Sequence, residues 1–153
     1  MSKILKIKAR QVFDSRGNPT IEAEVYSKNL SASAICPSGA STGTYEAFEK
    51  RDNNNKKYLG KSVLGAVNLV NTKISKKLTG TNIHDQTRID TILINLDGTR
   101  QKTNLGANAI LAVSMAAKKL SAKIKNIPLY KTFLVKNNYK LKVHYNRFAE
   151  IIL

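Results

Sequence analysis

The chain has 153 residues, of which 42% are apolar, so it is long enough for one domain with a core of its own. Its net charge of +16 suggests an anionic partner, but the lysines are spread from end to end without interleaved aromatic residues, so we expect nucleic acid not to be the primary partner. No apolar run approaches the roughly 18 residues of a membrane span, no signal-peptide block opens the chain, and the single Cys36 excludes an internal disulfide, so we expect a cytoplasmic chain.

Alternating apolar and polar residues predict three β-strands, over residues 4–13, 21–26 and 30–36. Residues 14–19 lie between the first two strands and are rich in Gly, Asn and Pro, which favour a turn. The third strand stops at Pro37, which cannot donate to a sheet. We therefore expect an antiparallel meander. The predicted buried face of the first strand carries Leu5, Ile7, Ala9 and Phe13.

The remainder of the chain changes to helical spacing. Apolar residues three and four apart predict a helix over residues 62–78, with Ser62 as its cap and Gly80 as its stop. A second helix is expected to begin after Asp85, whose side chain can cap it, and to end at residues 97–98, where an Asp-Gly pair stands.

A third helix is predicted over residues 105–124, with Gly106 inside it at some cost in helix propensity. One stripe of this helix consists of small residues, which permit a neighbouring element to approach closely. A short last segment begins at Pro128 and ends near Val135. Three strands followed by helices predict an α+β domain with a helical bundle packed on one face of the sheet. The stripe comprises Gly106, Ala107, Ala109, Ala112, Ser114, Ala116 and Ala117.

The segment between sheet and helices, residues 37–44, has the sequence PSGASTGT and contains no large apolar side chain. We expect such a segment to be mobile. It is either an ordinary connection or a flap over an anion or other ligand. It lacks the Gly-Lys-Ser/Thr of a phosphate-binding loop and the spacing of a dinucleotide site, so the loop alone does not choose between these alternatives.

Four longer motifs occur in a fixed order: DSRGNPT at residues 14–20, PSGASTG at 37–43, LDGT at 96–99 and LGANAILAVS at 105–114. Together with shorter matches they resemble the enolase family, and enolase proper rather than its racemase or cycloisomerase relatives. The resemblance covers roughly residues 3–141. It implies a small α+β domain that caps a larger catalytic β/α barrel. We therefore expect a capping domain over residues 1–141, a divergent tail over residues 142–153, and no barrel in this chain.

The resemblance also implies an activity. Enolases are magnesium-dependent lyases that interconvert 2-phosphoglycerate and phosphoenolpyruvate in glycolysis, act as homodimers and use two Mg2+ ions. Barrel residues supply the proton-transfer groups and the ligands of the first ion, so no catalytic residue is expected in this chain. The capping domain supplies a substrate loop, here Ser38, Gly39, Ala40, Ser41, Thr42 and Gly43.

Within that loop, the family likeness implies that Ser41 completes the second magnesium site when substrate is bound, with Gly39 and Gly43 as hinges. Arg10 and Glu22 resemble the pair that contacts the other subunit of the dimer. Both residues also fit a simpler interpretation, as solvated charges on the outer face of the sheet.

Two classes of function remain. The chain is either the amino-terminal part of an enolase, inactive by itself, or a stand-alone basic module that binds RNA, an acidic protein or an intact enolase. His144 lies in the divergent tail and is not expected to be catalytic. Tyr45 stands where the family often has histidine, so no acid or base role is assigned there.

Overall fold

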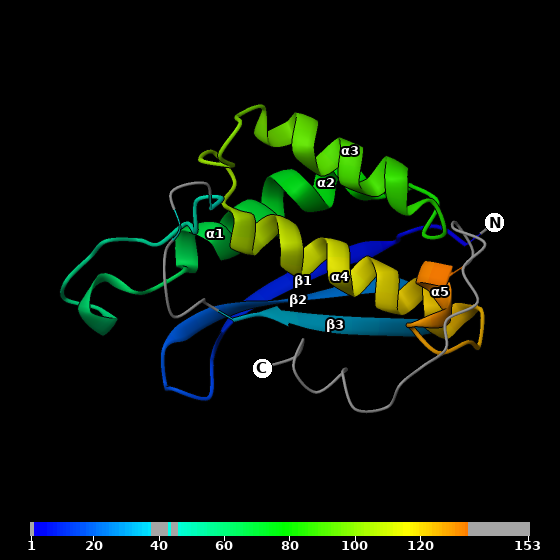
Figure 1. Cartoon of the computed structure of the whole chain (residues 1–153), viewed down its shortest axis with the longest axis horizontal. Helices are drawn as coiled ribbons and strands as arrows, with labels where there is room; N and C mark the ends of the chain where they lie inside the picture. The colour runs from blue at the N-terminus through cyan, green and yellow to red at the C-terminus, as the bar shows by residue number, and fades with distance from the viewer. Residues whose placement is uncertain (1, 38–42, 44–45, 135–153) are drawn as a thin grey trace.

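The structure, a computed structural model, describes residues 2–37, 43 and 46–134 and has an α+β fold of two layers (Figure 1). The three strands form one antiparallel sheet in the order β1-β2-β3, and the helices lie on one face of it. The predicted meander and fold class are confirmed. The strands are β1 (Lys6–Phe13), β2 (Pro19–Ser27) and β3 (Leu30–Cys36). The helices are α1 (Leu64–Leu69), α2 (Ser75–Leu78), α3 (Gln86–Asp97), α4 (Ala107–Ile124) and α5 (Lys131–Leu134).

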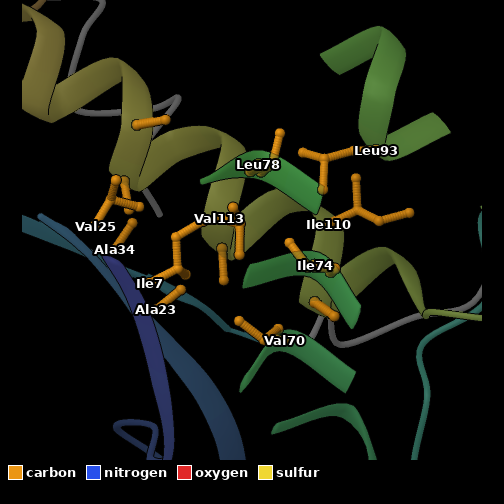
Figure 2. Packing of buried hydrophobic residues seen from close by; sticks show 14 of the residues in the cluster. Ile7, Ala23, Val25, Ala34, Val70, Ile74, Leu78, Leu93, Ile110 and Val113 are labelled. Atoms are coloured by element: carbon orange, nitrogen blue, oxygen red, sulfur yellow. The ribbon is translucent and has the colours of Figure 1, made fainter. Parts of the chain in front are cut away.

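Helix α4 runs along β2 and β3 and forms the centre of the core (Figures 1 and 2). Most of the small-residue stripe faces the interior, since Ala109, Ala112 and Ala116 are fully buried, whereas Ala107 and Ser114 are half-buried. Side chains of this size let the helix axis approach the sheet. None of the helices within the described ranges is long and apolar enough to cross a membrane.

Both ends of the first strand differ from the prediction. Leu5 and Phe13 are 54% and 52% exposed, whereas Ile4, one residue earlier, is fully buried. The amide of Ile4 donates to the Thr81 carbonyl oxygen (2.9 Å), so contacts with the loop after α2 set its orientation. The Phe13 ring packs edge-on against the Tyr58 ring outside the core, with centroids 5.4 Å apart.

The predicted helix over residues 62–78 exists but is not regular. A π-helical segment, Val70–Ile74, separates α1 from α2. Ser62 is not its cap, because the Ser62 hydroxyl donates to Gln11 Oε1 (3.0 Å) and the helix begins two residues later. The carboxylate of Asp52 binds the first free amides of α1 instead, at Leu64 and Gly65 (2.9 and 2.8 Å).

The ends of α3 follow the prediction. Asp85 Oδ1 accepts a hydrogen bond from the Arg88 amide (3.0 Å), and Gly98 closes the helix in the left-handed conformation, with φ of 72°. Gly106, in contrast, is not a residue of α4. It precedes the helix with φ of 93°, a value that side-chain-bearing residues rarely adopt.

Candidate functional site

The predicted substrate loop can be located from its two ends. Ser38, Gly39, Ala40, Ser41 and Thr42 lie outside the described residues, as do Tyr45 and the tail 142–153. Gly43 is described and exposed. The described residues on either side of the loop are its entry (residues 36–37) and its exit (residues 43 and 46–52).

The entry is fixed by β2. Thr20 is fully buried, and its hydroxyl donates to the Cys36 carbonyl oxygen. Burial, with a smaller effect of the Glu49 carboxylate, raises the pKa of the Cys36 thiol to about 11. Cys36 thus remains a thiol at neutral pH and packs, partly buried, against the core.

The DSRGNPT turn lies beside the entry. Asp14 Oδ1 accepts from the amides of Asn18 and Arg16, both at 2.9 Å. These bonds, the one from Asn18 foremost, outweigh the effect of burial and lower the pKa of Asp14. Asn18 Oδ1 also accepts from Lys61 Nζ (2.9 Å), which links the turn to the segment that leads into α1.

The exit begins with a reciprocal pair of hydrogen bonds. The Gly43 amide donates to Glu46 Oε2 (2.8 Å), and the Glu46 amide donates to the Gly43 carbonyl oxygen (3.1 Å). Phe48 follows, with its amide bound to the Gln101 carbonyl oxygen (2.7 Å) and its own carbonyl oxygen bound by the Ala107 amide (2.8 Å). The exit is therefore joined to the start of α4 within a few residues of the loop.

Asn108 holds the exit at a second point. Its Oδ1 accepts from the Lys50 amide and its Nδ2 donates to the Lys50 carbonyl oxygen, both at 3.1 Å, and Asn108 is 3% exposed. A side-chain amide thus takes the place of a neighbouring strand for this irregular backbone. Gly106 permits the approach, because a Cβ there would lie 2.5 Å from Lys50 Cβ.

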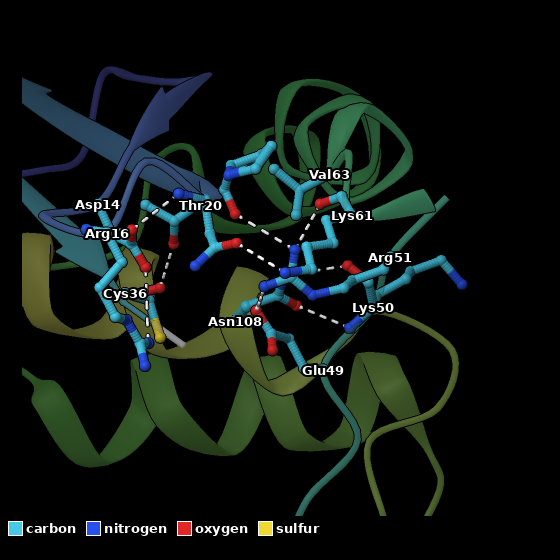
Figure 3. A network of polar contacts seen from close by, with 12 residues as sticks. Asp14, Arg16, Thr20, Cys36, Glu49, Lys50, Arg51, Lys61, Val63 and Asn108 are labelled. Carbon is cyan, nitrogen blue, oxygen red and sulfur yellow. Dashed lines mark hydrogen bonds and ion pairs between the residues drawn. The ribbon is translucent and has the colours of Figure 1, made fainter. Parts of the chain in front are cut away.

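Arg51, a residue of the exit, reaches β2 and the segment before α1 (Figure 3). Its guanidinium contacts the Glu49 carboxylate at 2.8 Å and donates to the carbonyl oxygens of Pro19 (3.3 Å) and Lys61. Pro19 opens β2, whose next residue holds Cys36. One bonded network therefore joins the DSRGNPT turn, the two ends of the loop and the LGAN start of α4. Its outermost members in the sequence, Asp14 and Asn108, stand 94 positions apart.

Three of the anchoring residues are not among the candidate residues that the sequence predicts: Arg51, Asp52 and Asn108. Asn108 stands inside the LGANAILAVS motif, where a polar residue among small apolar ones signals a buried hydrogen bond. Arg51 and Asp52 lie in a charged stretch without periodicity, which offers no such signal.

The structure places Arg10 and Glu22 opposite each other on β1 and β2 and joins them in an ion pair of 2.7 Å. The Arg10 side chain is 64% exposed and that of Glu22 is 13% exposed. Arg10 has further donors that face solvent, whereas Glu22 is largely covered. The contact with a second subunit that the family resemblance implies for this pair stays a prediction.

In the described part of the chain, no group of three or more His, Cys, Asp or Glu side chains could hold a metal ion. These residues therefore do not fit a magnesium site by themselves. Ser41, the ligand implied by the family resemblance, lies outside them.

Comparison with known proteins identifies the chain. The family model described as the enolase amino-terminal domain matches residues 4–133. This chain belongs to the enolase amino-terminal domain family. The enolase of Pelagibacter ubique (strain HTCC1062) is 96% identical over 141 residues, which are 92% of this chain and 34% of that protein. The enolases of Methanosarcina mazei and Methanococcus vannielii are 52% and 57% identical, each over 92% of this chain and 33% of the relative.

The chain thus spans about a third of the length of the curated enolases that it matches. The family match favours the enolase interpretation over a stand-alone basic binding module. The family match also agrees with the motifs. Residues of the motifs that resemble enolase, among them Asn18, Pro19 and Asn108, take part in the bonded network on either side of the loop.

Proposed function

We propose that this domain serves in an enolase. Together with a catalytic barrel of the family, it would take part in the magnesium-dependent interconversion of 2-phosphoglycerate and phosphoenolpyruvate, in a cytoplasmic homodimer. The proposal is supported by the 96% identity to a protein named enolase over nearly the whole chain.

The observation that carries the proposal is the bonded network around the loop. Entry and exit are held by hydrogen bonds from the side chains of Thr20, Arg51 and Asn108. A frame of this kind fixes where a short, small-residue loop starts and ends, and functional loops are commonly supported in this way. We infer that the frame presents Ser41 to the substrate site.

The chemistry explains why such a loop is needed. The proton removed from 2-phosphoglycerate lies next to a carboxylate, and its removal adds negative charge to that group. Bound magnesium would absorb this charge, and the oxygens of Ser41 are hard, neutral ligands that suit the ion. This domain's part would be to place those oxygens and to exclude water.

The test joins this chain to the barrel of a relative and compares the parent fusion with Ser41→Ala. We expect Ser41→Ala to lower turnover by on the order of a hundredfold to a thousandfold and to raise the magnesium concentration that half-maximal turnover requires. The melting temperature should stay unchanged. Ser15→Ala, at an exposed serine of the neighbouring turn, is the matched control and should leave all three quantities unchanged. The 153-residue chain assayed alone should show no turnover.

Equal turnover of Ser41→Ala and Ser15→Ala would remove Ser41 from the site while leaving the family assignment intact. Turnover by the chain alone would contradict the division of labour between domain and barrel.

A further inference from the structure

The exit of the loop has no buried residue of its own. Residues 43, 46–48 and 52 are exposed, and residues 49–51 are half-buried. Phe48, the largest apolar side chain of the exit, is 44% exposed. Burial of apolar surface therefore does little to fix where this backbone lies, so hydrogen bonds to the rest of the domain have to fix it.

Asn108 supplies two of these bonds from a buried position, as Figure 3 shows. Its Oδ1 accepts from the Lys50 amide and its Nδ2 donates to the Lys50 carbonyl oxygen, both at 3.1 Å, while the residue is only 3% exposed. Two bonds to one residue fix the orientation of its backbone as well as its distance from α4. Because α4 packs along β2 and β3, Asn108 ties the exit to the centre of the core.

The stability of α4 by itself does not explain an asparagine at this position. Asn108 stands in the first turn of the helix, but its polar side-chain atoms bind Lys50, and the helix begins at Gly106 without a side-chain cap. Asparagine is also a poorer helix former than alanine, which occupies the positions on either side. What the side chain does in the fold is to hold the backbone that follows the loop.

We propose that Asn108 is a positioning residue for the enolase reaction, an inference that rests on the proposed function. By fixing Lys50 it sets the course of the backbone that leaves the loop, and Lys50 follows Ser41 by nine positions in the sequence. Asn108 is buried and both its polar atoms are engaged, so its effect passes through the loop. A displacement of about 1 Å at a group that takes part in a reaction can cost on the order of a hundredfold in rate.

The test is a double-mutant cycle in the fusion of this chain to the barrel of a relative. Turnover is compared among the parent, Asn108→Ala, Ser41→Ala and the double variant, at a temperature at which melting curves show all four folded. We expect Asn108→Ala alone to lower turnover by on the order of tenfold to a hundredfold. In the Ser41→Ala background it should lower turnover by less than about threefold, because the side-chain oxygen that it helps to place is already gone.

Asn71→Ala is the matched control. Asn71 also binds both backbone groups of one residue, since its Oδ1 accepts from the Ala9 amide (2.7 Å) and its Nδ2 donates to the Ala9 carbonyl oxygen (3.1 Å). The substitution removes the same two kinds of bond in the middle of β1 instead of at the loop. We expect Asn71→Ala to turn over like the parent, even where its melting temperature falls.

Asn108→Asp is a second, nearly isosteric variant. Its carboxylate can still accept from the Lys50 amide but cannot donate to the Lys50 carbonyl oxygen. We expect its turnover to lie between those of the parent and Asn108→Ala.

Three results would overturn the inference. The first is a loss of turnover in Asn108→Ala that is just as large in the Ser41→Ala background, because Asn108 would then not act through Ser41. The second is parent turnover in both Asn108 variants, and the third is an equal loss in Asn71→Ala, since either would leave Asn108 with a structural role alone. In all three cases a loss of turnover in Ser41→Ala would leave the proposed function standing, whereas unchanged turnover in Ser41→Ala would contradict both.

Discussion

Gly106 provides a direct test of how the loop exit is held. Replacing it by alanine would introduce a Cβ 2.5 Å from Lys50 Cβ and 2.5 Å from Asn108 Oδ1. It would also place a side-chain-bearing residue at φ of 93°. Gly80 is the matched control, because its φ is 89° but no atom lies within 4 Å of the Cβ it would gain.

The two substitutions share the backbone strain and differ in crowding. Backbone strain of this kind costs on the order of 1–3 kcal/mol. Carbon atoms attract best at about 3.5–4.0 Å, so Gly106→Ala forces the backbone at Lys50 to move, at a further cost of about 1–3 kcal/mol. We expect Gly106→Ala to lower the free energy of unfolding by about 4 kcal/mol and Gly80→Ala by about 1.5 kcal/mol.

Urea unfolding measures both values, and hydrogen exchange of the Lys50 amide reports whether Asn108 still binds it. That amide should exchange faster in Gly106→Ala and at the parent rate in Gly80→Ala. If the two variants lose the same free energy, or if the Lys50 amide stays protected in Gly106→Ala, the close contact between the exit and α4 is not what holds the loop.

Two further predictions concern buried polar groups near the site. Asn108→Ala should lower the free energy of unfolding by about 2 kcal/mol, since it leaves the Lys50 amide and carbonyl without partners. The control is Asn104→Ala, at an exposed asparagine with one bond to the Asp97 carbonyl oxygen, which should lower it by less than about 1 kcal/mol. Burial raises the pKa of Asp97, but hydrogen bonds from Leu105 and Thr99 outweigh it and hold the pKa below its ordinary value of 3.8. The stability that Asp97 contributes is therefore present above about pH 4 and is lost as the pH falls through the lowered pKa. The free energies of unfolding of the parent and of Asp97→Asn, measured by urea unfolding across the acid range, should therefore differ above about pH 4 and converge once the pH is below the lowered pKa.

The parts of the fold that the sequence predicted are those governed by periodicity and by local caps. The three strands, the position of α3 and the small-residue face of α4 each follow from contacts between residues close in sequence or on one face. The Asp85 cap and the Gly98 stop were predictable because donor and acceptor lie within four residues of one another.

The predictions failed where a distant residue replaced a local one. Ser62 looks like a helix cap in sequence, but its hydroxyl donates a hydrogen bond to Gln11, 51 residues away. The carboxylate of Asp52 binds the helix amides in its place. Helical spacing continues through Gly106 and so predicts it inside the helix, and only the proximity of Lys50 shows why the position is glycine.

The segment from residue 46 to residue 63 shows most clearly why the site was harder to predict than the fold. It has little regular structure, so its backbone groups need partners from elsewhere, and side chains supply several of them. Asn108 binds Lys50 across 58 residues, and Arg51 reaches Pro19 across 32. No window of sequence contains both members of such a pair. Motifs carry the information only in combination, since residues of DSRGNPT and LGAN are held in place by contacts with Lys61, Arg51 and Lys50 rather than by their own neighbours. A motif resemblance could therefore locate the loop, whereas the contacts that hold it required the structure.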